Sequence, residues 1–159
     1  MNVDAQMIKA IVSLYSSPTF AVKIGCNTSE WMAQDRGIRQ GCPLSPYLFL
    51  IVMTVLFRDV HAELNLTRGT LDPLSYAELL YADDTVLITN NTSAMNRFLK
   101  KIEEHATYFG LRFNKQKCAA LAINTNAQPL FANGQKVKRQ SSAIYLGANI
   151  NVGDNPRLD

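Results

Sequence analysis

The sequence predicts an α+β fold in which an antiparallel sheet that contains a tight hairpin is backed by two helices. Two short apolar runs, 77–81 (AELLY) and 85–89 (TVLIT), flank a pair of acidic residues and are typical of hairpin strands. The continuous apolar run 47–57 and the apolar stripe of residues 93–109 indicate the helices. With 47% apolar and 18% charged residues among 159, the chain has the composition of one globular domain.

A loop that leads into a helix is predicted over residues 36–49 (RGIRQGCPLSPYLF). Gly37 and Gly41 permit close approach of the backbone, and three residues mark the helix start: Pro43, Ser45 and Pro46. Arg39 and Gln40 supply a cation and an amide between the glycines. Because a helix N-terminus offers free backbone N–H groups, such a loop can receive a phosphate or a base edge. Gly and Pro are also common before any helix, so a purely structural role for this loop stays open.

The apolar run 47–57 is 11 residues long, about half of the roughly 20 residues that a membrane-crossing helix needs. It therefore predicts a buried helix, and we expect no membrane partner. The pattern becomes amphipathic toward Leu64. The apolar half of this helix should lie against the back of the sheet that carries Asp83.

Further elements are predicted downstream. A helix over 93–109, capped by Thr92 or Ser93, should end at Gly110. The dipeptide Asn133-Gly134 is a strong turn signal and predicts a hairpin. The strands expected in this half are 121–133, 135–138 and 143–150.

Asp83 and Asp84 are the strongest candidates for chemistry. They stand at a turn between nearly continuous apolar residues, where two neighbouring carboxylates would suffer desolvation and mutual repulsion unless a cation neutralises them. Mg²⁺, with Mn²⁺ as an alternative, suits these ligands because it keeps several waters and takes only one or two carboxylates plus substrate phosphates. Aspartate also tolerates turn backbones well, so a structural role is the competing interpretation.

Together, the segments Gly37–Pro46 and Tyr81–Asp84 resemble the palm domain of reverse transcriptases, most closely those of non-LTR retrotransposons and group II introns. The first carries the family pattern Gly-x-Arg-Gln-Gly-x-Pro-Leu-Ser-Pro, and the second, about forty residues later, carries Tyr-Ala-Asp-Asp. Residues 110–117 (GLRFNKQK) look like the next family block, and residues 14–25 are similar to the lead-in. The resemblance runs from about 8 to 150.

The resemblance implies nucleotidyl transfer by two metal ions at a palm hairpin. It makes Asp83 a metal ligand and Asp84 an accessory ligand, with Tyr81 and Ala82 shaping the turn beside the primer end. Lys117 matches a family lysine near the pyrophosphate. The implied nucleotide and template contacts are Arg39, Gln40, Gly41 and Pro43, and the implied primer-grip hairpin carries Tyr145, Leu146 and Gly147. The implied partners are an RNA template, a DNA primer and deoxynucleoside triphosphates.

One part of the family pattern is missing. Polymerases of this class use another carboxylate, in a block that reads hydrophobic-Asp-x-x-x-Ala-Phe-Asp, and this sequence has no such block. We therefore interpret residues 1–159 as a single partial palm domain without fingers, first-aspartate strand or thumb, which needs the upstream segment of the same polymerase. Two alternatives stay open: a catalytically inactive remnant that keeps the fold and binds nucleic acid, and, less favoured, an RNA-directed RNA polymerase, whose turn more often reads Gly-Asp-Asp.

Charge is divided unevenly along the chain. Residues 1–89 hold 6 Lys and Arg against 9 Asp and Glu, a net of −3, whereas residues 97–139 hold 9 against 2, a net of +7. Cations beside a polymerase site would offset template and primer phosphates. The favoured candidates are Lys115, Lys117, Lys136, Lys138 and Arg139, whereas Arg97, Lys100 and Lys101 can equally be the solvated face of a helix.

The remaining chemically notable residues have ordinary interpretations. Three widely spaced cysteines predict no disulfide framework and an intracellular setting, with Cys42 and Cys118 as small buried side chains. His61 and His105 fall in predicted helices without a partner carboxylate at a triad-like position, and we interpret them as ordinary helix residues. Trp31, the only tryptophan, is expected in the core.

Overall fold

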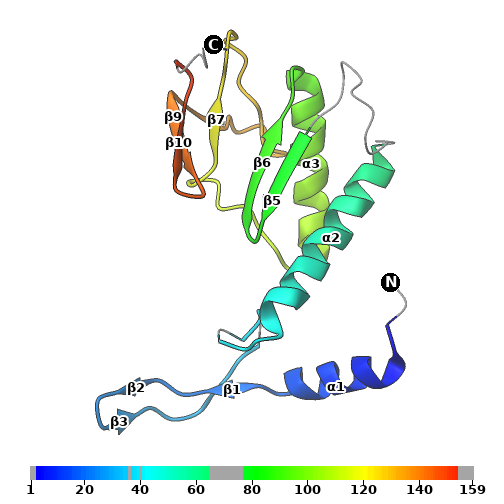
Figure 1. Cartoon of the computed structure of the whole chain (residues 1–159), viewed down its shortest axis with the longest axis vertical. Coiled ribbons are helices and arrows are strands. Elements are labelled where there is room, and N and C mark those ends of the chain that lie inside the picture. The colour runs from blue at the N-terminus through cyan, green and yellow to red at the C-terminus, as the bar shows by residue number, and fades with distance from the viewer. Residues whose placement is uncertain (1–2, 36, 40, 65–76, 154–159) are drawn as a thin grey trace, which may run out of the picture. The chain divides into compact units, whose positions relative to one another are not determined.

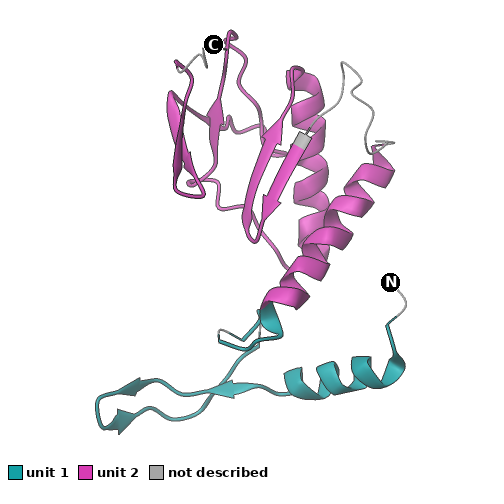
Figure 2. Cartoon of the chain, viewed as in Figure 1, with its two compact units in different colours: residues 1–45 teal, residues 46–159 magenta. Residues whose placement is uncertain are grey.

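The computed structural model describes residues 3–35, 37–39, 41–64 and 77–153 (Figure 1). They belong to two compact units, residues 1–45 and residues 46–159 (Figure 2). The first is a helix followed by an extended β-ribbon, and the second holds two long helices with the remaining strands.

The first unit begins with helix α1, Ala5–Tyr15. Asp4 caps this helix, because its Oδ1 accepts hydrogen bonds from the backbone N–H groups of Gln6 (2.7 Å) and Met7 (3.4 Å). A two-part ribbon follows. Strand β1 (Thr19–Phe20) pairs with β4 (Met32–Ala33), and β2 (Lys23–Ile24) pairs with β3 (Asn27–Thr28), both antiparallel.

The ribbon contains a bulge opposite Ala21 and Val22. These two residues lie between Phe20 and Lys23, whereas three residues, 29–31, lie between their partners. The Ser29 hydroxyl accepts a hydrogen bond from the Val22 N–H at 2.9 Å and donates to the Glu30 carbonyl. A bulge redirects the side chains beside it, and Trp31 is 73% exposed. The expectation that Trp31 lies in the core is therefore wrong.

The second unit is built around two helices. Helix α2, Ser45–Glu63, starts at the end of the first unit, and α3 spans Thr92–Tyr108. Both agree with the predicted helices within one or two residues, but the cap of α3 is Asn91, whose Oδ1 accepts from the Ala94 N–H at 3.0 Å. The expected cap at Thr92 or Ser93 is wrong by one residue.

The strands of the second unit pair locally. They are β5 (Ala77–Tyr81), β6 (Asp84–Ile88), β7 (Ala119–Leu121), β8 (Lys138–Gln140), β9 (Ser142–Tyr145) and β10 (Ala148–Asn151). Hairpin β5–β6 and hairpin β9–β10 are antiparallel, whereas β7 and β8 run parallel. Throughout the described residues the sheets are two-stranded, so the single antiparallel sheet that we expected is not formed there.

Two expectations for the C-terminal third need correction. A turn forms at Asn133-Gly134, where the Gly134 N–H donates to the Phe131 carbonyl at 2.9 Å. The hairpin around it is reduced to one bridge, Leu130 with Lys136. The predicted last strand, 143–150, folds back on itself as the hairpin β9–β10. Sequence patterning located the turn at Asn133-Gly134 but missed the turn within 143–150, whereas the family resemblance had implied a hairpin there.

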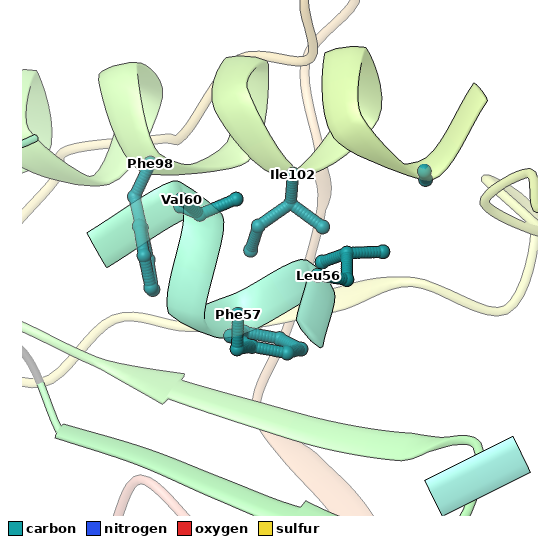
Figure 3. Packing of buried hydrophobic residues seen from close by; sticks show 6 residues of the cluster. Leu56, Phe57, Val60, Phe98 and Ile102 are labelled. Carbon is teal, nitrogen blue, oxygen red and sulfur yellow. The ribbon is translucent and has the colours of Figure 1, made fainter. Parts of the chain in front are cut away.

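The core lies where α2 crosses α3 (Figure 3). Its buried side chains recur at helical spacing, so each helix contributes one stripe: Leu56, Phe57 and Val60 from α2, and Phe98, Ile102 and Ala106 from α3. The rings of Phe57 and Phe98 meet edge to face at 6.3 Å between centroids. Leu87 of β6 packs against this cluster and joins the hairpin to the helices. By length and composition alone α2 also resembles a membrane span, a test that core helices of this kind pass as well.

A second cluster fixes the segment between β7 and β8. Leu99 of α3, Phe131 and Val137 are buried together. Two side chains of α3 cap backbone N–H groups of this segment: Asn96 Oδ1 accepts from Leu130 at 2.8 Å, and Glu103 Oε1 accepts from Ala132 at 3.1 Å. These bonds satisfy a loop that makes few ladder hydrogen bonds of its own.

Candidate functional site

The two predicted catalytic acids stand at the turn of hairpin β5–β6. Tyr81 pairs with Asp84, which leaves Ala82 and Asp83 as a two-residue turn. Ala82 has φ of 51°, a left-handed conformation that costs a non-glycine residue roughly 1–2 kcal/mol. Turns with a positive φ at the first central residue match the twist of hairpin strands. Backbone strain of this kind clusters at functional sites and fixes the direction of the neighbouring side chains.

Both carboxylates face water. Asp83 and Asp84 are exposed, and so are Leu79, Leu80 and Tyr81, at 50%, 42% and 61%. The apolar flanks therefore do not desolvate the acids, and the expectation that burial forces a cation onto them is wrong for the described chain. Solvent screens their mutual repulsion instead.

The hairpin has one face on the core and one open face. Glu78 and Leu87 are paired and half-buried on the inner face, where Leu87 joins the core. Leu79 and Tyr81 alternate with them and are exposed. The open face is thus apolar, and it continues to the acidic turn.

The inner face carries a histidine–glutamate contact that links the hairpin to the helices. His61 Nε2 lies 3.0 Å from Glu78 Oε1, and the imidazole stacks on the Phe98 ring at 5.9 Å. The pair lacks hydrogen-bond geometry. His105 likewise contacts Glu63, at 2.7 Å. Both histidines lie on helices as predicted, and each contacts a carboxylate of another element, Glu78 or Glu63, which the sequence pattern did not pair with it.

The second predicted block is a compact loop before α2. The Arg39 carbonyl accepts hydrogen bonds from the Cys42 N–H at 3.3 Å and from the Ser45 hydroxyl at 2.6 Å. Gly37 and Gly41 have φ of 82° and 81°, which favours glycine, and a Cβ on either would meet nothing within 4 Å. The glycines thus serve backbone conformation, not close packing within this chain. Pro43 is exposed, and Gln40 lies outside the described residues.

Tyr15, the last residue of α1, contacts this loop, and sequence reasoning missed it. Its hydroxyl lies 2.9 Å from Ser45 Oγ and 4.0 Å from Cys42 Sγ, and the Arg39 guanidinium lies over its ring at 5.8 Å. Ser45 is only 4% exposed. The signal was present as an aromatic residue at the end of a helix, but only the fold brings it to a loop some 25 residues further on.

Cys42 is half-buried and differs from a simple packing residue. The backbone N–H of Leu44 holds the pKa of its thiol below the ordinary value, assisted by the Ser45 N–H and the Tyr15 hydroxyl. Cys118 is also half-buried, but burial raises the pKa of its thiol. The two cysteines therefore have different environments, although the sequence suggested the same role for both.

The block 110–117 ends in an exposed lysine. Gly110 has φ of 69° and ends α3, and Lys117 projects from a turn in which its N–H donates to the Asn114 carbonyl at 3.0 Å. Lys115 is engaged within the protein: its Nζ lies 3.4 Å from Glu103 Oε2 and 4.8 Å from the centre of the Phe131 ring. That engagement makes Lys115 a structural residue and weakens it as a candidate for nucleic acid.

The other basic candidates differ in the same way. Arg139 donates to the Thr125 carbonyl at 3.0 Å and to Asn126 Oδ1 at 3.4 Å, so it holds the segment after β7. Lys101 is paired with Glu63 and Glu104, which makes it more than a solvated helix residue. Lys136 and Lys138 are exposed.

The predicted primer-grip residues form the turn of hairpin β9–β10. Tyr145 pairs with Ala148 and is half-buried, and Leu146 and Gly147 occupy the two turn positions with φ of 50° and 82°. Positive φ at both positions identifies a type I′ turn, which usually carries Asn or Gly. Leu146 is therefore strained and is also 52% exposed.

A metal ion in this chain would depend on the acidic turn. Within the described part of the chain, no group of three or more His, Cys, Asp or Glu side chains converges as a metal cage would require. Two exposed carboxylates at one turn fit Mg²⁺, which binds through one or two carboxylates and fills its other positions with water and phosphate.

Sequence comparison decides the family. The pattern of the reverse transcriptase (RNA-dependent DNA polymerase) family matches residues 1–150, which spans both compact units and both candidate blocks. The chain belongs to the reverse transcriptase family.

Similar proteins come from mobile elements of insects. The Pol polyprotein of the type-2 retrotransposable element R2DM of Drosophila melanogaster is 30% identical over 134 residues, 77% of this chain. The corresponding R2 polyprotein of Nasonia vitripennis is 29% identical over 118 residues, 74% of the chain. The RNA-directed DNA polymerase of the jockey element of Drosophila melanogaster is 25% identical over 154 residues, 91% of the chain. The chain corresponds to only 12%, 11% and 16% of the lengths of these relatives.

Proposed function

We propose that this chain is the palm segment of a retroelement RNA-directed DNA polymerase and transfers nucleotides once an upstream segment supplies the first aspartate. The observation that carries the proposal is the acidic turn Tyr81–Asp84, held by a strained Ala82 on a hairpin that packs on the α2–α3 core. The family match across residues 1–150 supports it. Residues 1–159 would act as one partial palm domain.

In this proposal Asp83 is the metal ligand that the chain contributes, and Asp84 assists as a second ligand or through its charge. Mg²⁺, or Mn²⁺ in its place, would lower the pKa of a primer hydroxyl and neutralise the triphosphate. The positive φ of Ala82 fixes the direction in which Asp83 leaves the turn. Tyr81 would flank the primer end from its exposed position on β5.

The loop before α2 would bind the nucleotide. Arg39, Gly41 and Pro43 are the proposed contacts, together with Gln40. Arg39 offers a cation for phosphate, and the exposed backbone at Gly41 lets a nucleotide approach closely. Lys117 would neutralise the leaving pyrophosphate from its exposed turn.

The C-terminal hairpin would hold the primer. Its turn presents Leu146 and Gly147, with Tyr145 half-buried behind them. The apolar tip has no polar group with which to read a base, so it suits packing against a sugar. RNA template, DNA primer and deoxynucleoside triphosphates are the partners that follow from this assignment, and the relatives that we compared are DNA polymerases or Pol polyproteins.

The test places these residues in the R2 polyprotein of Drosophila melanogaster, in place of the matched segment, and measures primer extension on RNA with Mg²⁺. We expect extension by the chimera and none by the 159-residue chain alone. Asp83→Asn should abolish extension by the chimera. Asp59→Asn is the matched control, because among the described residues the Asp59 carboxylate pairs with its neighbour Arg58 on α2 and not with the acidic turn. Extension by the isolated chain would refute the need for an upstream aspartate.

A second candidate function is nucleic-acid binding without catalysis. It is favoured by the net charge of +7 over residues 97–139 and by the exposure of Lys117, Lys136 and Lys138. A chimera that binds RNA as tightly as the parent polyprotein but fails to extend a primer would support this remnant over the polymerase.

A further inference from the structure

We propose that Tyr15 is a positioning residue for the nucleotide loop, through a hydroxyl relay that runs from Tyr15 to Ser45 to the backbone of Arg39. The inference rests on the proposed function of that loop. It assigns a role to a residue of α1 that precedes this loop by more than 20 residues in the sequence.

The relay has a defined direction. The Ser45 hydroxyl donates to the Arg39 carbonyl at 2.6 Å, so its only proton is committed there. Tyr15 then donates the contact of 2.9 Å between the two hydroxyls, which is much shorter than its other contact, 4.0 Å to Cys42 Sγ. Ser45 is 4% exposed, which shields these bonds from competing water.

The loop needs such a tether because a glycine stands on each side of Arg39. Gly37 and Gly41 flank Arg39 in left-handed conformations, and glycine loses more conformational freedom on ordering than any other residue. The Arg39 carbonyl is held by Ser45 and by the Cys42 N–H. Without the relay, the Cys42 turn alone would restrain it, and Arg39 would sample more positions.

Tyr15 acts on Arg39 a second time through its ring. The guanidinium lies 5.8 Å from the ring centre, within the range of a cation–π contact. The hydroxyl thus restrains the backbone of Arg39, and the ring restrains its side chain. Because its backbone and its side chain are both restrained, Arg39 loses less conformational entropy when it binds a triphosphate.

The experiment uses the full 159-residue chain and follows tryptic cleavage after Arg39 by peptide-resolved mass spectrometry. Cleavage needs an opened loop, so its rate reports on the tether. Tyr15→Phe removes the hydroxyl but keeps the ring, and we expect cleavage about two- to tenfold faster, the effect of losing one hydrogen bond. Tyr15→Leu removes both contacts and should cleave faster still.

The same cleavage assay with added dATP and Mg²⁺ then measures nucleotide binding at the loop. In the wild-type chain it should protect the bond after Arg39, and in Tyr15→Phe protection should require a several-fold higher dATP concentration. Tyr108→Phe is the matched control, since Tyr108 is 81% exposed on α3. It should leave both cleavage and protection unchanged. Far-ultraviolet circular dichroism checks that every variant is folded.

The outcomes separate this inference from the proposed function. Unchanged cleavage in Tyr15→Phe would refute the tether itself. Faster cleavage with an unchanged dATP midpoint would refute the positioning role. Absence of protection even in the wild-type chain would overturn nucleotide binding at this loop, and the inference with it, while the cleavage rates would still report whether the relay exists.

Discussion

Glu63 at the end of α2 contacts His105 of α3 at 2.7 Å between Oε2 and Nε2, and its other oxygen accepts a hydrogen bond from Lys101. One carboxylate therefore ties a lysine and a histidine of the neighbouring helix to the end of α2. Lys101 also pairs with Glu104, so the network crosses from helix to helix and continues along α3.

This network predicts a loss of stability in acid. The hydrogen bond from Lys101, followed by that from His105, holds the pKa of Glu63 below its ordinary value. A carboxylate with a lowered folded-state pKa adds stability above its unfolded pKa and loses it as the pH falls through the folded pKa. We expect the melting temperature of the wild type to fall more steeply below about pH 4.5 than that of Glu63→Gln. An equal fall of the melting temperature with pH in the wild type and in Glu63→Gln would contradict the prediction.

The same network makes the opposite prediction at high pH for Lys101. Its pKa is raised, first by the hydrogen bond to Glu104 and then by that to Glu63. A raised pKa adds stability below the unfolded value, and that stability is lost only as the pH rises toward the folded value. Because these side chains are partly exposed to solvent, the effect should shrink at high salt. Melting at pH 7 in low and high salt measures it, with Lys136→Met, which replaces an exposed lysine outside this network, as the control beside Lys101→Met.

A core substitution tests the helix packing. Leu56 is 1% exposed in the α2–α3 cluster, so Leu56→Ala removes packed atoms and leaves a cavity. We expect a loss of about 2–5 kcal/mol in the free energy of unfolding by urea. Leu50→Ala is a matched control on the same helix, because Leu50 is 50% exposed, and it should cost well under half as much. Equal losses would refute the assignment of the core to the second half of α2.

Local sequence signals predicted the helices and the turns well, for a physical reason. Both kinds of signal depend on residues close together in the sequence. Examples are the periodic apolar stripe of α3, Phe98, Ile102 and Ala106, and the turn at Ala82 and Asp83. Pairings between distant segments were not accessible. The parallel pairing of β7 with β8 and the caps that Asn96 and Glu103 give to the loop 129–132 depend on tertiary packing, which periodicity does not encode.

The candidate site shows the same division. Residue types at 39–43 and 81–84 identified both blocks, because the chemistry is carried by contiguous residues. The exposure of Asp83 and Trp31 was mispredicted, since apolar neighbours in sequence need not cover a side chain in space. Tyr15 was missed because its hydroxyl gains meaning only when α1 brings it to Ser45.

The exposed lysines should contribute more to nucleic-acid affinity than Lys115, which is engaged within the protein. Lys136 and Lys138 are exposed, so replacing both with Gln should weaken binding of single-stranded RNA and reduce the slope of log K against log salt by about 1.4, roughly 0.7 for each phosphate contact. Lys115→Gln also removes a positive charge, but the Lys115 ammonium already contacts Glu103 and the Phe131 ring. It should change RNA affinity little while lowering the melting temperature. A larger loss of affinity from Lys115→Gln than from the double variant would contradict this division.

Strain at the acidic turn gives the last prediction. Ala82 has φ of 51°, and a Cβ in this conformation is unfavourable, so Ala82→Gly should stabilise the chain by up to about 1 kcal/mol. Ala119→Gly in strand β7, where φ is not positive, should instead destabilise it by roughly 0.5–1 kcal/mol. Urea unfolding of both variants compares the two signs directly. In the R2 chimera, Ala82→Gly should at the same time lower the rate of primer extension, because a freer turn holds Asp83 less firmly. A more stable variant with undiminished extension would show that the strained residue is not needed to direct the carboxylate.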